Sequence, residues 1–280
     1  MNVISVVTPV HADAVRFLPE AYASLLAQEL PEGWSWEWCV QEDGAGVGAA
    51  VRLPTDDGRI RISASRAGGP HVARTMAFAR SAGSYVKTLD ADDRLTPGAL
   101  ARDVAVLREH PSVGWTTSRV VDLLEDGSTV SFEGSDPHPG RLRRGSAFRF
   151  WKERRRPQVH PATLCVRRSL MALLGGWMAL PASGDTGLLM GLDSLADGWF
   201  IGETGLLYRK HGGQITAHPD HTGGTEWEAR MSLIRERAEA LRMWTGTEAL
   251  VRSGTAAFTP LSRIPDQDSP GMRRSALRER

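Results

Sequence analysis

Three aspartates stand close together near the end of the first third of the chain, at Asp90, Asp92 and Asp93. Residues 84–88 directly before them have the composition of a strand, so the acids follow a strand end. Carboxylates this close raise one another's pKa unless a positive group lies between them. Mg²⁺ is such a group, because it binds one or two carboxylates together with phosphate oxygens. A solvated turn before a helix is the alternative, and the triplet alone leaves both open.

The elements that must position these acids alternate between strands and helices. A β-branched run over residues 3–8 is typical of a strand buried on both faces. Apolar residues at helical spacing separate this run from later strand patterns, which cover residues 34–40, 59–62 and 85–89. This order predicts an α/β protein with a mostly parallel central sheet flanked by helices.

Two further segments end strands in the same way as the aspartate triplet. Thr8-Pro9 follows the first predicted strand, and Glu42-Asp43-Gly44 follows the second. In open α/β sheets, ligands bind beyond the carboxyl ends of the strands. We therefore expect these segments and Asp90-Ala91-Asp92 to converge on one crevice.

Composition limits the class of protein and its partners. The chain has 280 residues with 34 basic and 33 acidic side chains, so no overall field favours nucleic acid or a membrane surface. Cys39 and Cys165 lie in apolar, strand-like runs, which indicates buried thiols in a reducing compartment. There is no charged leader, and no apolar run reaches the roughly 18 residues that a bilayer requires. We expect a cytoplasmic protein without a membrane span. The basic run over 141–156 is either solvated surface or a guide for an anionic acceptor.

The ordered set of motifs resembles a family 2 glycosyltransferase. The resemblance covers roughly residues 3 to 215 and follows the segments 6–10, 42–44, 83–93, 160–168, 175–177, 184–185 and 208–211. It implies a GT-A fold, in which a Rossmann-like nucleotide-binding half merges with an acceptor-binding half. It also implies inverting transfer from a nucleotide-sugar and a divalent metal, Mg²⁺ or Mn²⁺.

The resemblance assigns five residues to the nucleotide. Thr8, Pro9 and Asp43 are expected to frame the base, Arg74 to lie along the nucleoside, and Asp90 to contact the ribose. Two departures from the family pattern bear on these contacts. Arg66 and Thr75 stand where the family usually has asparagine.

Three further residues are implied for the diphosphate and the reaction. Asp92 is expected to hold the metal, His211 to assist it, and Asp185 to act as catalytic base. Gly184 precedes Asp185 where an acidic residue is common. This departure leaves Asp193 and Asp197 as rivals for the base.

The resemblance also predicts how the chain is divided. Residues 1–244 are expected to form the GT-A domain, with a nucleotide-sugar half over 1–110 and an acceptor half with a C-terminal helix over 111–244. Residues 245–280 lose hydrophobic density and are expected to form a loose tail.

The predicted reaction is transfer of a sugar from a nucleotide-diphosphate donor to a hydroxyl of a small molecule or saccharide. We expect the donor to be UDP-linked and the pathway to be secondary-metabolite or cell-envelope biosynthesis. The sequence leaves a homodimer open. One alternative is a metal-dependent nucleotidyltransferase, but residues 8–13 contain neither the glycine nor the cation that would cradle a triphosphate. A non-catalytic nucleotide-sugar-binding protein is the other alternative.

Overall fold

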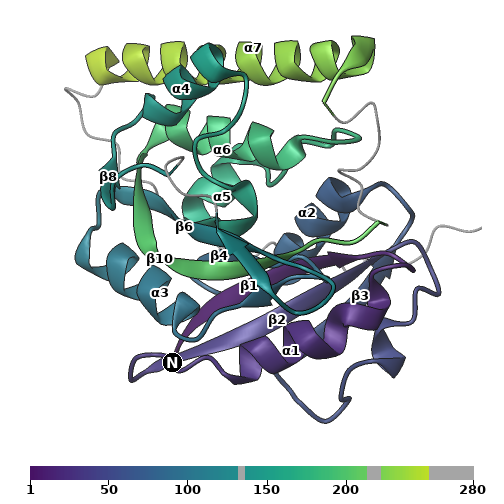
Figure 1. Cartoon of the computed structure of the whole chain (residues 1–280). Helices are drawn as coiled ribbons and strands as arrows, with labels where there is room; N and C mark the ends of the chain where they lie inside the picture. The colour runs from purple at the N-terminus through teal and green to yellow at the C-terminus, as the bar shows by residue number, and fades with distance from the viewer. Residues whose placement is uncertain (132–135, 213–221, 252–280) are drawn as a thin grey trace, which may run out of the picture.

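The computed structural model describes residues 1–131, 136–212 and 222–251, the last seven of these by their backbone alone. One sheet of 10 strands runs through the molecule, with helices on both faces (Figure 1). Its main path has the order β3-β2-β1-β4-β9-β6-β10-β5. The predicted α/β class is confirmed.

The first half of the sheet is parallel, as the alternation of strands and helices predicts. Its strands are β1 (Asn2–Val10), β2 (Trp34–Asp43), β3 (Ile60–Ser65) and β4 (Tyr85–Thr88). Strand β1 pairs with β2 on one side and with β4 on the other. Residues 4–10 of β1 are all buried, which agrees with a strand covered on both faces.

The second half joins this sheet through antiparallel pairs. Strand β9 (Cys165–Arg167) pairs antiparallel with both β4 and β6 (Val113–Leu123). Strand β6 is parallel to β10 (Asp197–Arg209), and the short strands β5 (Arg94–Leu95), β7 (Thr129–Ser131) and β8 (Gly140–Leu142) complete the sheet with antiparallel pairs. The parallel arrangement that we predicted therefore holds throughout the first half. In the second half only β6 and β10 run parallel, and antiparallel pairs add the short strands and connect the halves.

The sheet separates two hydrophobic cores, one on each of its faces. Helices α1 (Leu18–Leu26) and α3 (Ala99–Glu109) pack on one face. The other face is covered by α2 (Pro70–Arg80), α4 (Ser146–Arg154), α5 (Arg168–Leu174), α6 (Gly184–Leu195) and α7 (Gly224–Val251). Helix α7 lies outermost, over α4 and α6 (Figure 1).

Three local boundaries place residues of interest. The 3-10 turn η3 (Pro161–Thr163) precedes β9, because His160 caps it and proline donates no backbone hydrogen bond. Helix α6 begins at Gly184, so Asp185 lies in its first turn. Helix α7 continues past Trp244 to Val251, while the rest of the predicted loose tail lies outside the described residues.

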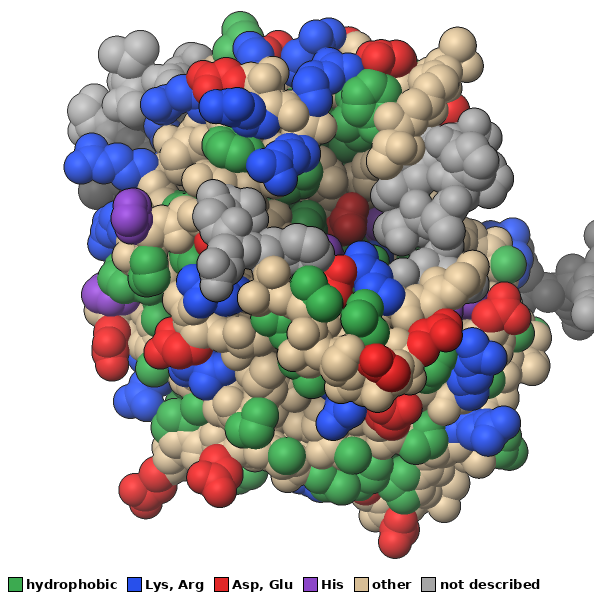
Figure 2. Space-filling model, viewed as in Figure 1, with side chains coloured by type: hydrophobic (Ala, Val, Ile, Leu, Met, Phe, Trp, Pro, Cys, Tyr) green, Lys and Arg blue, Asp and Glu red, His purple; other side chains and the backbone are tan. Residues whose placement is uncertain are grey.

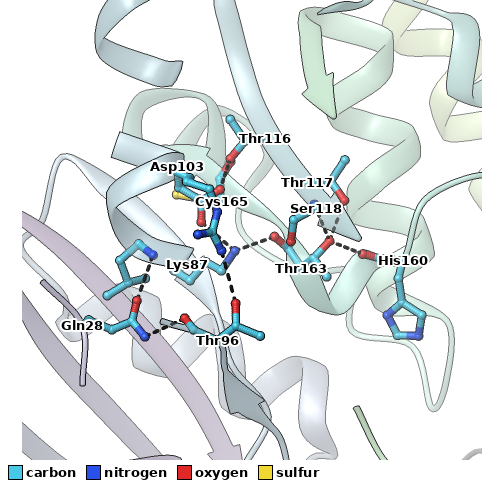
Figure 3. A network of polar contacts seen from close by, with 12 residues as sticks. Gln28, Lys87, Thr96, Asp103, Thr116, Thr117, Ser118, His160, Thr163 and Cys165 are labelled. Atoms are coloured by element: carbon cyan, nitrogen blue, oxygen red, sulfur yellow. Dashed lines mark hydrogen bonds and ion pairs between the residues drawn. The ribbon is translucent and has the colours of Figure 1, made fainter. Parts of the chain in front are cut away.

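A buried polar network contacts η3 through Thr163 (Figure 3). The Lys87 ammonium contacts the Asp103 carboxylate at 2.7 Å and donates to the Thr163 carbonyl at 2.7 Å. Thr116 donates to the other oxygen of Asp103 at 2.6 Å. Because both charged side chains are only 1% exposed, this network fixes the turn without taking part in solvent contacts.

None of the helices in the described part of the chain combines the length and the apolar character that a bilayer-spanning helix requires.

Candidate functional site

A cavity of about 720 Å³ opens beyond the carboxyl ends of β1, β2 and β4. Figure 2 shows the hollow near the middle of this face, with acidic side chains in its depth. Six of the eight predicted site residues line it, namely Pro9, Asp43, Arg74, Asp90, Asp92 and Asp185. The predicted convergence of three strand ends on one crevice is therefore present in the structure.

Arg74 and Asp90 form an ion pair on the nucleotide-binding side predicted from the sequence. The guanidinium Nη2 lies 2.5 Å from Asp90 Oδ1, and their side chains are 7% and 23% exposed. Burial alone would lower the pKa of Arg74, but Asp90 and the nearby Asp185 raise it. Arg74 therefore stays charged between two carboxylates, while Asp90 keeps part of its surface open to the cavity.

Asp92 meets His211 at the edge of the cavity. Asp92 Oδ2 lies 3.0 Å from His211 Nε2, and the imidazole packs against the Phe17 ring at a centroid distance of 5.1 Å. Arg209, on β10, donates to the Asp92 carbonyl at 2.8 Å. The last strand of the fold thus holds the acidic turn that follows β4.

The third aspartate of the triplet points away from the cavity. Asp93 is 1% exposed and accepts the Arg209 backbone N–H at 2.9 Å. Its other oxygen has no hydrogen-bond partner among the described residues. Burial, followed by the charges of Asp92 and Asp90, raises the pKa of Asp93 well above its usual value. Asp93 is therefore a buried anchor of the turn.

Asp185 occupies the first turn of α6, where backbone N–H groups favour a negative charge. Burial alone would raise the pKa of Asp185, but His71, Arg74 and the Thr186 N–H together lower it. Since the carboxylate is ionised at neutral pH and lines the cavity, it can accept a proton there.

The rival bases lie elsewhere. Asp193 is fully buried, and its side chain accepts the N–H groups of Ala147 and Phe148 at the start of α4. Asp197 pairs with Arg141 at 3.1 Å. Neither of the two aspartates lines the cavity.

The side chains of Thr8 and Asp43, both predicted to frame the base, form hydrogen bonds within the protein. The buried Thr8 hydroxyl donates to the Leu89 carbonyl at 2.7 Å and accepts from the Trp38 indole at 2.8 Å, and Thr8 does not line the cavity. Asp43 Oδ1 accepts the N–H groups of Gly68 at 2.7 Å and Gly69 at 3.1 Å, so it shapes the loop that leads into α2.

Three histidines that we did not predict as site residues, His11, His71 and His160, also line the cavity. His71 precedes Arg74 by three positions on α2, a spacing that places both on one helix face and was the signal available in the sequence. His160 packs against Tyr208 at a centroid distance of 4.8 Å, and burial lowers its pKa. Its Nδ1 accepts the Ala162 N–H at 3.4 Å, so the neutral ring carries its proton on Nε2.

The charges around the cavity allow the fit of a divalent cation to be tested. Seven aspartates but only three lysines or arginines line the described cavity. This acidic excess would repel a diphosphate unless a cation offset it. Asp92 and His211 are adjacent and both have side chains that can bind a metal ion. Among the described residues, no group of three or more His, Cys, Asp or Glu is placed to hold one. The residues thus fit a cation that takes its other ligands from phosphate or water.

Comparison with known structures places the fold. The chain superposes on crystal structures of S. aureus TarS residues 1–349 in complex with UDP-GlcNAc, with a TM-score of 0.68, 18% identity, and coverage of 84% of this chain and 65% of that chain. The complex of TarS with UDP gives a TM-score of 0.61 at 17% identity, covering 75% of this chain and 61% of that chain. The expected GT-A fold is therefore confirmed.

Sequence comparison places the family. The chain is 30% identical over 180 residues to the O-antigen biosynthesis protein RfbC of Myxococcus xanthus, and the alignment covers 62% of this chain and 13% of that protein. The uncharacterized protein y4gI of Sinorhizobium fredii is 35% identical over 131 residues, which are 45% of this chain and 14% of that protein. The chain thus spans a small part of the length of both relatives. The sequence profile of Glycosyl transferase family 2 matches residues 5–170, and the chain belongs to this family of nucleotide-sugar glycosyltransferases.

Proposed function

We propose that this chain transfers a sugar from a UDP-linked donor to a hydroxyl of a saccharide or small-molecule acceptor, with inversion at the anomeric carbon. The observation that carries the proposal is the single cavity, on a family 2 fold, into which Asp90, Asp92 and Asp185 all open. The similarity to TarS, solved with UDP and with UDP-GlcNAc, supports uridine as the base.

The nucleoside would bind along the first half of the sheet, within residues 1–110. Pro9 and Asp43 would border the base, and the open edge of Asp90 would accept ribose hydroxyls while Arg74 fixes its other oxygen. Thr8 would act indirectly, because its hydroxyl is already used in joining β1 to Trp38 and Leu89.

The diphosphate would lie beside Asp92 and His211. We propose these two residues as ligands of Mg²⁺ or Mn²⁺, because they are adjacent and the surrounding cavity is acidic. When bound, the cation would stabilise the negative charge that develops on the leaving diphosphate. The hydrogen bond from Arg209 to the Asp92 carbonyl would keep the turn in place during this step.

Asp185 would be the general base, and the acceptor would be bound mainly by the second half, within residues 111–244. Its carboxylate would take the proton from the acceptor hydroxyl while that oxygen bonds to the anomeric carbon and the bond to the diphosphate breaks. Such base assistance contributes about 10²–10⁴-fold to a rate. The lowered pKa of Asp185 supports this role, since the base must be ionised before it can act.

For the acceptor, the name of the Myxococcus relative favours a saccharide of the cell envelope over a small metabolite. His160 and Tyr208 lie together on the cavity wall and offer an imidazole N–H beside an aromatic ring. This combination suits a sugar ring, which presents hydroxyl groups at its edges and apolar C–H groups on its faces.

A thermal-shift panel tests the donor. We expect UDP to raise the unfolding temperature more than GDP or ADP, and more with Mn²⁺ than with EDTA, because a ligand that binds only the folded state stabilises it by mass action. Equal shifts for all three nucleotides would contradict uridine specificity, and no shift with any of them would contradict the donor site.

Asp185→Asn tests the base. We expect the variant to bind UDP as the wild type does but to lose about 10²–10⁴-fold in kcat for release of UDP from UDP-GlcNAc. Asp197→Asn is the matched control, because Asp197 is a rival candidate that pairs with Arg141 and does not line the cavity. Full activity of Asp185→Asn would overturn the assignment.

A further inference from the structure

His71 joins the two sides of the cavity. It lies in the first turn of α2 and is 5% exposed. Its Nδ1 is 3.0 Å from Arg74 Nη1, and its Nε2 accepts the Gly184 backbone N–H at 3.0 Å. One imidazole therefore contacts both Arg74, which pairs with Asp90, and Gly184, which directly precedes Asp185 at the start of α6.

The ring also explains why residue 184 is a glycine. An added Cβ at this position would lie 2.5 Å from Cγ of His71 and 2.5 Å from the Met178 carbonyl oxygen. The imidazole therefore fills the space that a side chain at 184 would need. The same close approach brings the Gly184 N–H within reach of Nε2, so the glycine and the histidine form one arrangement.

We propose that His71 is a positioning residue that sets the location of Asp185 relative to the nucleotide-binding pair of Arg74 and Asp90. This inference rests on the proposed function, in which Asp185 is the base. The free N–H groups at the start of a helix need an acceptor, and here a side chain from another helix supplies it. The contact therefore fixes the start of α6, and with it Asp185, against α2.

A shift of the base by about 1 Å can lower a rate by about 10²-fold without loss of ground-state binding. His71 is accordingly expected to affect kcat more than nucleotide affinity. A neutral imidazole offers an acceptor at only one ring nitrogen, and the Gly184 N–H requires it at Nε2. Glutamine can place its carbonyl oxygen near the position of Nε2 and keep this acceptor, whereas the shorter asparagine side chain reaches only the position of Nδ1 and loses it.

The experiment compares His71→Ala, His71→Gln and His71→Asn in the full chain. UDP affinity with Mn²⁺ is measured by calorimetry, and kcat and KM are measured for UDP release from UDP-GlcNAc. We expect His71→Ala and His71→Asn to lose about 10²-fold in kcat with UDP affinity within about threefold. His71→Gln is expected to recover kcat to within about tenfold of the wild type.

Arg237→Met is the matched control. Arg237 lies on α7 outside the cavity and donates to the Gly187 carbonyl of α6 at 3.2 Å and to the Leu174 carbonyl at 3.0 Å, so it also holds α6 in place. The kcat of this variant is expected to stay within about threefold of the wild type. A loss in Arg237→Met equal to that in His71→Ala would show a general effect of helix packing and would overturn the proposal.

Hydrogen–deuterium exchange supplies a readout that does not depend on turnover. The peptide that contains Gly184 is expected to exchange faster in His71→Ala and His71→Asn, and at the wild-type rate in His71→Gln. Unchanged exchange and unchanged kcat in His71→Ala would refute the positioning role. Loss of protection together with full activity of Asp185→Asn would instead refute the base assignment and leave the His71 contact standing.

Discussion

Two ion pairs of this molecule have similar contact distances but different surroundings. Lys87 and Asp103 are 2.7 Å apart and 1% exposed, and neighbouring hydroxyl and carbonyl groups complete their hydrogen bonds. Arg74 and Asp90 are 2.5 Å apart, but Asp90 is 23% exposed and Arg74 Nε has no hydrogen-bond partner among the described residues.

The difference in exposure distinguishes an ion pair that stabilises the fold from one that can bind a ligand. A buried network in which every member is satisfied rigidifies the fold around it. A cluster that opens to a cavity with incomplete hydrogen bonding retains capacity for a ligand. Here the first network is buried and contacts η3, and the second forms the cavity wall, so charge alone does not indicate a site.

The largest expected effect is on the buried pair. Lys87→Met should lower the free energy of unfolding by about 3–5 kcal/mol, because it leaves Asp103 buried without its counter-charge. Urea unfolding followed by circular dichroism measures this. The double variant Lys87→Met/Asp103→Leu is the control and should recover most of the loss. A loss below about 1 kcal/mol in the single variant would show that the pair is not essential.

A substitution in the cavity should affect ligand affinity much more than stability. We expect Asp92→Asn to change the free energy of unfolding of the unliganded protein by less than about 1 kcal/mol. Its affinity for UDP in Mn²⁺ should fall by about tenfold or more, equal to about 1.4 kcal/mol, and should no longer depend on the metal. Titration calorimetry with Mn²⁺ and with EDTA measures this. Retained metal dependence would remove Asp92 from the proposed ligands.

Asp93 is buried like the Lys87–Asp103 pair but follows the cavity residue Asp92 directly, and its effect on stability should depend on pH. Because the folded-state pKa of Asp93 is raised, the native protein binds more protons than the unfolded chain above the usual aspartate pKa, and this carboxyl therefore lowers stability as pH rises. Asp93→Asn should remove that contribution and stabilise the protein at pH 8 relative to pH 5 by on the order of 1 kcal/mol. Unfolding at both pH values in EDTA tests this, and an unchanged pH dependence would contradict it.

The smallest effect concerns the thiols. Burial raises the pKa of Cys39 to about 12 and that of Cys165 well above its usual value. Both should react with a thiol reagent only when the protein opens. Cys165 pairs with Lys87 across β4 and β9, so Lys87→Met should accelerate its labelling more than that of Cys39. Equal acceleration at both cysteines would indicate global rather than local opening.

Local patterns predicted much of the first half of the molecule. The β-branched run of β1 and the alternation of β2 identify strands whose ends must meet at one edge of a parallel sheet. Pro9, Asp43 and the two cavity aspartates consequently lie where the order of elements indicated. The second half was harder, because β9 is only three residues long and its antiparallel pairs join segments far apart in sequence.

The site residues divide in the same way. Asp90 and Asp92 were found because they follow a strand directly. His71 and His160 were not assigned, because a three-residue spacing such as that of His71 from Arg74 is common on helices, and a histidine before a proline has no distinctive spacing. Their place in the cavity depends on contacts with Gly184 and Tyr208, which are more than 40 positions away.

The sequence by itself determined the class of fold, the strand ends that form the cavity, and the acids available there, because these depend on local periodicity and on the geometry of parallel sheets. Only the tertiary structure decided which charges face the cavity. It turned Asp92 toward His211 but buried Asp93 one position later, and it placed Asp185 rather than Asp193 in the cavity. Burial and pairing arise from distant segments, and neighbours in sequence with the same side chain can therefore have different chemistry.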